Sequence, residues 1–180
     1  MLKQRGGRPL HSYTGNNLYL IILVLILCVS LCGTSCALEN PSVNTSDSMA
    51  QVVRVIDGDT IEVNSGGKLY TVRYIGIDTP ETANSPKGAE PYGPEASLKN
   101  KELVAGKNVR LEKDVSETDQ YGRLLRYVYV GDLFVNAELV RTGYAQAVTY
   151  PPDVKYQSLF LQLQREAREA GRGLWGLRQF

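Results

Sequence analysis

Two acidic segments contain the side chains of this sequence that are best suited to chemistry. They are Asp57-Gly58-Asp59-Thr60 and Asp78-Thr79-Pro80-Glu81, and each falls where a turn is expected. The two runs between them predict the strands of a hairpin, which can bring its acidic ends together. Carboxylates that gather in one place repel each other unless protons or a cation intervene, and hard oxygen ligands favour Ca²⁺ or Mg²⁺. The arrangement therefore indicates a site for a divalent cation.

A cationic residue, Arg73, lies inside the second predicted strand, where a charge is unusual. Its planar guanidinium offers paired N–H donors that match phosphate oxygens, which lysine cannot imitate. By itself, an arginine in a strand is usually ion-paired or reaches solvent along its aliphatic stem. A single Asp-Gly-Asp is likewise usually a plain turn. A functional interpretation is favoured because these residues occur together.

Four motifs follow one another along the chain: Ile56-Asp57-Gly58-Asp59-Thr60, Arg73 to Glu81, Tyr92-Gly93-Pro94-Glu95-Ala96 and Asp119-Gln120-Tyr121-Gly122-Arg123. In this order and spacing they resemble the motifs of the thermonucleases, the staphylococcal-nuclease-like Ca²⁺-dependent nucleases. The resemblance covers about residues 51–175. It implies an endonuclease that hydrolyses phosphodiester bonds of DNA and RNA, acts best on single-stranded or accessible substrate, and leaves 3′-phosphate ends.

The resemblance also implies a set of metal ligands. Asp59 and Asp78 would bind Ca²⁺ through carboxylate oxygens, and Thr79 would bind it through its backbone carbonyl. Asp57 resembles an outer-shell residue. Calcium is the implied cofactor because its flexible oxygen shell accepts such a mixture of ligands.

Three charged residues match the catalytic positions of the family. Arg73 and Arg123 would hold the phosphate, and their charge matters most as negative charge builds up in the transition state. Glu81 would act as the general base or orient the attacking water. The resemblance thus implies in-line hydrolysis with two arginines and one carboxylate.

Substrate contacts are implied at three further residues. Tyr121 lies two residues before Arg123, in the family position that packs against the nucleotide, and Tyr150 is a second aromatic contact. Lys87, in the loop before the third motif, is a candidate electrostatic contact. The chain departs from the family at Gln120, where a lysine is common, and around Tyr150, where two tyrosines are often found.

The predicted elements suit a small β-rich domain. Apolar runs bounded by turn residues predict five strands, and helical periodicity predicts three helices. Five strands interrupted by one helix fit the OB-fold, although the barrel itself is implied by the family resemblance. We therefore expect an α+β fold, mainly β, with a five-stranded OB-fold barrel and about three helices. The predicted strands cover 52–56, 60–63, 69–77, 109–113 and 124–130, and the helices cover 95–104, 135–142 and about 156–170.

An apolar leader precedes the domain. Basic residues lie before the run Leu18–Leu31, and small residues follow it, which is typical of a secretory signal. Residues 1–37 are thus predicted to be a signal peptide or an N-terminal membrane anchor, and lipid attachment at Cys36 is a third interpretation. All three export the domain, either secreted or anchored to the outer face of the cell membrane. Residues 38–50 are polar and predict a flexible linker, which leaves 51–180 as the domain.

Composition narrows the function further. Three of the 20 basic residues precede the leader, so 17 remain against 19 acidic residues, and no overall basic surface is indicated. Nucleic acid must then be held by local basic groups or through a cation. The only histidine, His11, precedes the leader, so a histidine-based nuclease mechanism is excluded for the exported domain. All three cysteines, Cys28, Cys32 and Cys36, lie in the leader, so the domain is expected to fold without disulfides. We also expect it to be a monomer.

The main alternative is a non-catalytic OB-fold module that binds nucleic acid. Such a module would keep the barrel and lose the charged residues of the site. All five of these residues stand in the sequence, which favours the enzyme: Asp59, Arg73, Asp78, Glu81 and Arg123.

Overall fold

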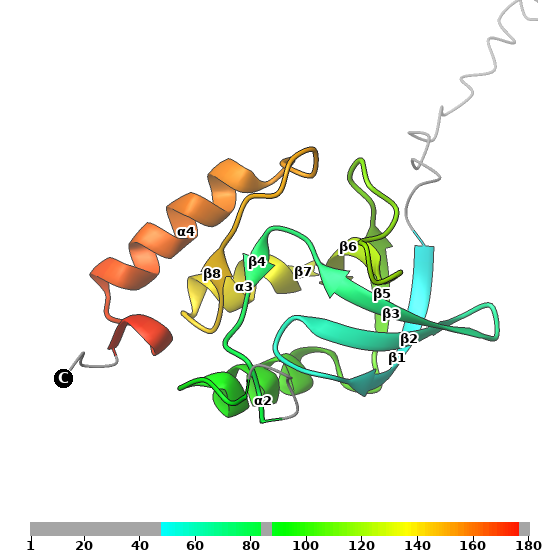
Figure 1. Ribbon diagram of the computed structural model, residues 1–180, viewed down its shortest axis with the longest axis horizontal. Helices are drawn as coiled ribbons and strands as arrows, with labels where there is room; N and C mark the ends of the chain where they lie inside the picture. Colours follow the sequence, from blue (N-terminus) through cyan, green and yellow to red (C-terminus); the bar gives the residue numbers. More distant parts are fainter. Residues whose placement is uncertain (1–47, 84–87, 177–180) are drawn as a thin grey trace, which may run out of the picture. The chain divides into compact units, whose positions relative to one another are not determined.

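The computed structural model describes residues 48–83 and 88–176, so the predicted leader and Lys87 lie outside the described residues. The described residues form a closed barrel of five strands with three α-helices around it (Figure 1). Among them, no helix is long and apolar enough to cross a membrane.

Pairing of neighbouring strands closes the barrel. The strands β1 (Ser48–Val55), β2 (Thr60–Ser65) and β3 (Lys68–Tyr74) form an antiparallel meander. β1 also pairs with β5 (Asn108–Glu112), which pairs with β6 (Leu124–Val130). The parallel pairing of β6 with β3 completes the ring and confirms the predicted five-stranded OB-fold barrel.

Alternation along these strands fills the barrel with apolar side chains. In β2 and β3, for example, Ile61, Val63 and Val72 are fully buried, as the period of two in a strand requires. Tyr74, Tyr127 and Phe160 are the largest of the fully buried side chains and extend the core toward the C-terminal helix. Burial of this aliphatic and aromatic area stabilises the domain, which needs no disulfide.

Helices cover the barrel on its outside. α2 (Gly93–Val104) follows the third motif, α3 (Val135–Arg141) follows the short strand β7 (Leu133–Phe134), and α4 (Gln157–Glu169) lies near the C-terminus. α3 packs against both α2 and α4, which lie well apart in Figure 1. These three helices agree with those predicted from the sequence, with ends shifted by a few residues.

A buried amide fixes α3 to the barrel. Asn136 is fully buried, accepts a hydrogen bond from the Val128 amide at 2.9 Å, and donates one to the Ile75 carbonyl at 3.0 Å. Both hydrogen bonds satisfy buried backbone groups that would otherwise lack a partner. The helix therefore depends on one polar residue as well as on apolar packing.

The predicted strand over 69–77 is wrong in its last part. β3 ends at Tyr74, and the chain turns at Gly76, whose φ of 78° is left-handed, before the short strand β4 (Ile77–Asp78). A Cβ on Gly76 would lie 2.5 Å from the Phe160 ring, so only glycine fits this turn. β4 then pairs with β8 (Gln146–Ala147) instead of continuing the barrel. The turn redirects Asp78 and Thr79 toward the start of β2.

The ends of the domain also differ in detail from expectation. β1 begins at Ser48, so it includes the last residues of the predicted linker, and Ser48–Gln51 pair with β5. At the other end, the 3₁₀ helix η1 (Gly173–Gly176) folds back, since the Leu174 amide donates to the Gly143 carbonyl at 2.9 Å. Trp175 is half-buried there, with the Arg168 guanidinium 4.2 Å from its ring centroid.

Candidate active site

The first acidic segment forms a tight turn between β1 and β2. The Asp57 carboxylate accepts a hydrogen bond from the Asp59 amide at 3.0 Å, the pattern by which aspartate stabilises turns. A Cβ on Gly58 would lie 2.6 Å from the Thr79 hydroxyl, so the absence of a side chain lets the second segment approach. The turn thus packs directly against Thr79.

Asp59 joins the two acidic segments. It is buried, and its Oδ2 accepts hydrogen bonds from the Thr79 amide at 2.8 Å and the Thr79 hydroxyl at 3.0 Å. Its Oδ1 accepts a hydrogen bond from the Thr60 hydroxyl at 3.1 Å. The structure therefore brings together the hairpin ends as the sequence predicts.

Arg73 lies between two of the carboxylates. Its Nη2 is 2.7 Å from Asp78 Oδ1 and 3.2 Å from Asp59 Oδ2. Its Nη1 donates to the backbone carbonyls of Tyr74 at 3.0 Å and Ile77 at 2.9 Å, which fixes the plane of the guanidinium. The Arg73 side chain is only 15% exposed, whereas that of Asp78 is 58% exposed. The salt bridge to Asp78 is accordingly the part of this arrangement that is open to solvent.

The oxygens of this cluster suit a hard divalent cation. Asp59 and Asp78 converge on one nitrogen atom of Arg73, so a single positive centre can contact both carboxylates. Within 48–83 and 88–176, no group of three or more His, Cys, Asp or Glu side chains is arranged to hold a metal ion. A site here would thus need ligands other than side chains, and the backbone carbonyl of Thr79 is the one that the sequence predicts.

Asp57 shows that negative charge is crowded at this end of the barrel. Burial and then the nearby charge of Asp59 raise the pKa of Asp57 to about 6, although hydrogen bonds and Arg73 act in the opposite direction. Asp57 is therefore more easily protonated than an exposed aspartate, and part of the cause is the neighbouring carboxylate of Asp59. Added positive charge would relieve the crowding.

Glu81 follows on the segment that leaves β4. Its amide donates a hydrogen bond to Glu90 Oε2 at 3.0 Å, and the Glu90 amide donates one to the Glu81 carbonyl at 2.9 Å. A Cβ on Gly93 would lie 2.1 Å from that carbonyl, so α2 begins in direct contact with the segment. The third motif, which contains Gly93, thereby positions the backbone of Glu81.

Arg123 immediately precedes β6, the strand that pairs with the Arg73 strand β3. The parallel register pairs Arg73 with Leu125, two residues after Arg123. Asp119 holds the arginine in place, because Arg123 Nε donates to Asp119 Oδ2 at 2.7 Å and the Arg123 amide donates to Oδ1 at 3.0 Å. Burial alone would raise the pKa of Asp119, but the hydrogen bonds from Arg123 and from the Tyr121 amide hold it below its usual value.

Both tyrosines among the predicted substrate contacts are strongly exposed. Tyr121 is 74% exposed, and Tyr150 is 68% exposed. The Cζ atom of Arg123 lies over the Tyr121 ring, 5.4 Å from the ring centroid. Exposed aromatic rings offer stacking surfaces to nucleic acid bases. Their exposure is compatible with the predicted substrate contacts, whereas Lys87 lies outside the described residues.

Asn100 is a residue of the site that sequence reasoning missed. It is fully buried in α2, accepts a hydrogen bond from the Tyr74 hydroxyl at 2.9 Å, and donates to the Asp57 carbonyl at 2.9 Å. It therefore links the helix to the acidic turn. The only signal in the sequence is a polar side chain on the apolar face of the helix. Asp119 was missed as well, although it lies in a quoted motif.

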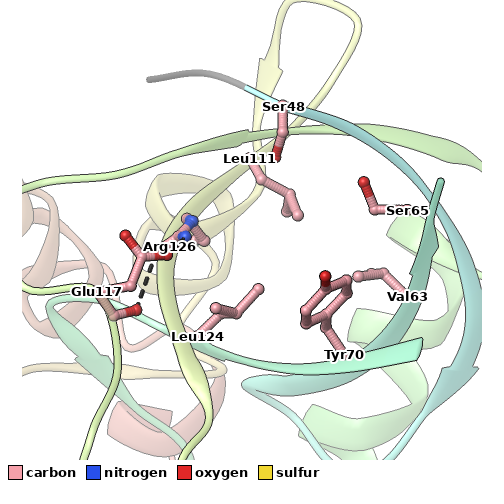
Figure 2. A pocket seen from close by; sticks show the side chains of 8 residues that line it. All are labelled: Ser48, Val63, Ser65, Tyr70, Leu111, Glu117, Leu124 and Arg126. Carbon is pink, nitrogen blue, oxygen red and sulfur yellow. Dashed lines mark hydrogen bonds and ion pairs between the residues drawn. The ribbon is translucent and has the colours of Figure 1, made fainter. Parts of the chain in front are cut away.

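A pocket of about 200 Å³ lies elsewhere on the barrel, toward the turn between β2 and β3 (Figure 2). Tyr70 and Leu124 line it together with Arg126, which forms an ion pair with Glu117. None of the predicted catalytic or metal-binding residues lines this pocket. The acidic cluster therefore does not belong to this pocket.

Comparison with known proteins identifies a family and several relatives of this chain. The family described as staphylococcal nuclease homologue matches residues 71–176. A thermonuclease of Staphylococcus intermedius is 38% identical over 158 residues, which cover 88% of this chain and 94% of the relative. A thermonuclease of Staphylococcus hyicus is 42% identical over 132 residues, 73% of this chain and 78% of the relative. Endonuclease YncB of Bacillus subtilis is 44% identical over 124 residues, 68% of this chain and 59% of the relative.

Proposed function

Because this chain belongs to the family of staphylococcal nuclease homologues, we propose that it is an exported Ca²⁺-dependent endonuclease that hydrolyses DNA and RNA. The observation that carries the proposal is the convergence of Asp59, Arg73, Asp78 and Thr79 at one end of the barrel. Its residue types combine oxygen ligands for a cation with a donor for phosphate. The names of the relatives, thermonuclease and endonuclease, support the same reaction class.

Arg73 and Arg123 bind the scissile phosphate in this proposal. Arg73 lies in β3, Arg123 directly precedes the paired strand β6, and each guanidinium is oriented by an aspartate. Oriented guanidinium groups stabilise the negative charge that develops on the phosphate oxygens in the transition state. Lysine would supply the charge without the paired donors.

Glu81 accepts a proton from the attacking water. The water oxygen forms a bond to phosphorus while the bond from phosphorus to the 5′ oxygen breaks, and the 5′ oxygen leaves with a proton from solvent. The products then carry a 3′-phosphate and a 5′-hydroxyl. The backbone contacts of Glu81 with Glu90 and Gly93 support this role because they fix the segment that bears the carboxylate.

Asp59 and Asp78 would hold the Ca²⁺ ion with the Thr79 carbonyl. When bound, the ion compensates the charge of the phosphate and polarises its oxygens. The fit is supported by the hard carboxylate oxygens and by the nearby charge of Asp59, which adds to burial in raising the pKa of Asp57. Mg²⁺ prefers a tighter octahedral shell and should support less turnover.

Export is the second part of the proposal, and it rests on the sequence of residues 1–37. The domain would be secreted, or anchored to the outer face of the cell membrane through the leader only, and would act as a monomer. Fractionation of cells that make the full chain tests this, because a soluble product inside the cell with an intact N-terminus would contradict it.

End-labelled single-stranded DNA and RNA oligonucleotides test the proposed reaction. We expect cleavage in Ca²⁺, less in Mg²⁺ and none in excess chelator, with 3′-phosphate ends on both substrates. Cleavage in chelator would refute the metal requirement, and 5′-phosphate ends would refute the assigned direction of attack. Binding without cleavage in Ca²⁺ would indicate instead a non-catalytic OB-fold module.

A further inference from the structure

Two loops of the domain carry the exposed tyrosines. The arginine loop, residues 113–123, connects β5 to β6 and contains Tyr121 and Arg123. The proline loop, residues 148–156, connects β8 to α4 and contains Tyr150. They are far apart in the sequence but project on the same side of the domain in Figure 1.

An aspartate of the proline loop binds the backbone of the arginine loop. Asp153 is only 7% exposed, and its Oδ1 accepts hydrogen bonds from the amides of Val115 at 3.0 Å and Ser116 at 2.8 Å. Hydrogen bonds from amides to a carboxylate are stronger than those between neutral groups. Asp153 is itself fixed, because its amide donates to the Tyr150 carbonyl at 3.1 Å.

The arginine loop returns the same kind of contact. Asp114 Oδ2 accepts a hydrogen bond from the Lys155 amide at 3.0 Å and another from the Tyr127 hydroxyl at 2.9 Å. Each loop thus supplies a carboxylate to the backbone of the other. Tyr127 lies in β6 and is almost fully buried, so this reciprocal clasp is anchored in the barrel core.

We propose that Asp153 is a positioning residue that, with Asp114, holds the two loops in one arrangement, so that Tyr121 and Tyr150 contact the same nucleic acid strand. The inference rests on the proposed function for its substrate. Contacts on separate loops act together only if the loops are fixed relative to one another, since ordering them on binding costs free energy. The carboxylate of Asp153 need not touch the substrate.

Oligonucleotide affinity and amide exchange together test this inference. The full-length chain with Glu81→Gln is titrated in Ca²⁺ with a fluorescent single-stranded DNA oligonucleotide, and Asp153→Ala, Asp153→Asn and Asp132→Ala are compared in that background. Asp132 is a matched control because it is exposed in the turn between β6 and β7. Hydrogen exchange at Val115 and Ser116 reports the state of the clasp.

Asp153→Ala should accelerate exchange at both amides and raise the dissociation constant about tenfold, because the loop side chains must then be ordered on binding. Asp153→Asn keeps an acceptor oxygen and should restore most of the affinity, while Asp132→Ala should change nothing. Unchanged affinity in Asp153→Ala despite faster exchange would overturn the inference, as would an Asp153→Asn variant as weak as Asp153→Ala. If Asp153→Ala does not fold, Asp114→Ala breaks the reciprocal bond and gives the same test.

Cleavage by the chain without the Glu81 substitution is measured in parallel. Failure to cleave, with binding that still depends on Asp153, would refute the proposed nuclease and support the clasp. Cleavage with the same KM in Asp153→Ala and in the parent would refute the proposed role of Asp153 in substrate binding. The proposed nuclease activity would then still stand.

Discussion

At the acidic end of the barrel, Asp59 and Asp78 both form ion pairs with Arg73, whereas Glu112 in β5 forms ion pairs with two cations, Arg110 and Lys155. Glu112 Oε1 accepts hydrogen bonds from Lys155 Nζ at 2.5 Å and the Tyr156 hydroxyl at 3.0 Å. Its Oε2 accepts one from Arg110 at 3.3 Å. Burial alone would raise the pKa of Glu112, but these three partners hold it below its usual value.

The pKa values of Asp57 and Glu112 shift in opposite directions, and this difference distinguishes a candidate functional cluster from one that stabilises the fold. The pKa of Asp57 is raised to about 6, first by burial and then by the nearby charge of Asp59. The pKa of Glu112 is lowered because its cluster is fully compensated. A cluster that is satisfied within the protein stabilises the fold, and one with excess charge is available to a cation or a substrate.

The largest expected effect is at Glu81. Glu81→Gln keeps the shape of the side chain and removes its basicity, so kcat should fall about 10²–10⁴-fold. Ca²⁺ should still bind, which calorimetry can establish on the same preparation. Turnover equal to that of the parent would mean that Glu81 is not the base.

Arg73→Lys should cost about 10²–10³ in kcat, with a smaller change in KM, because paired donors act mainly in the transition state. Arg123→Lys should behave similarly, since Asp119 orients that guanidinium. Steady-state kinetics with a labelled oligonucleotide measure both. Glu112→Gln is the comparison, and its kcat should stay near that of the parent at a temperature where it is folded.

Glu112→Gln should instead destabilise the fold, by about 2 kcal/mol at pH 7, because charged hydrogen bonds are lost. The folded-state pKa is lowered, so the ionised carboxylate stabilises above the ordinary pKa, and this stability is lost as pH falls. Urea unfolding at several pH values should show the gap between variant and parent closing in acid. A gap that persists there would contradict the assigned charge interactions.

Asp57→Asn should change stability in the opposite direction. The folded-state pKa is raised from 3.8 to about 6, so stability is lost as pH rises through this window. The variant escapes that loss and should be up to about 3 kcal/mol more stable than the parent at pH 7 without Ca²⁺. No gain is expected near pH 4, where the parent carboxyl is protonated, and a gain of equal size there would contradict the interpretation.

Much of the fold and site could be predicted because the informative residues are local in sequence. Alternation located the barrel strands, and the motifs around Asp59 and Asp78 placed the hairpin ends together. The turn at Gly76 was missed because its cause is the ring of Phe160, far along the chain. Asn100, Asn136 and Asp153 were missed for the same reason, since each binds backbone that is distant in sequence.

Calcium calorimetry on three chains tests the central claim most directly: that the acidic cluster, and not the Glu112 cluster, is the functional site. The parent chain should bind one Ca²⁺, Asp78→Asn should bind it much more weakly because one ligand carboxylate is lost, and Glu112→Gln should bind it like the parent. Equal Ca²⁺ affinity in the parent and Asp78→Asn, or a loss of binding in Glu112→Gln, would contradict the account.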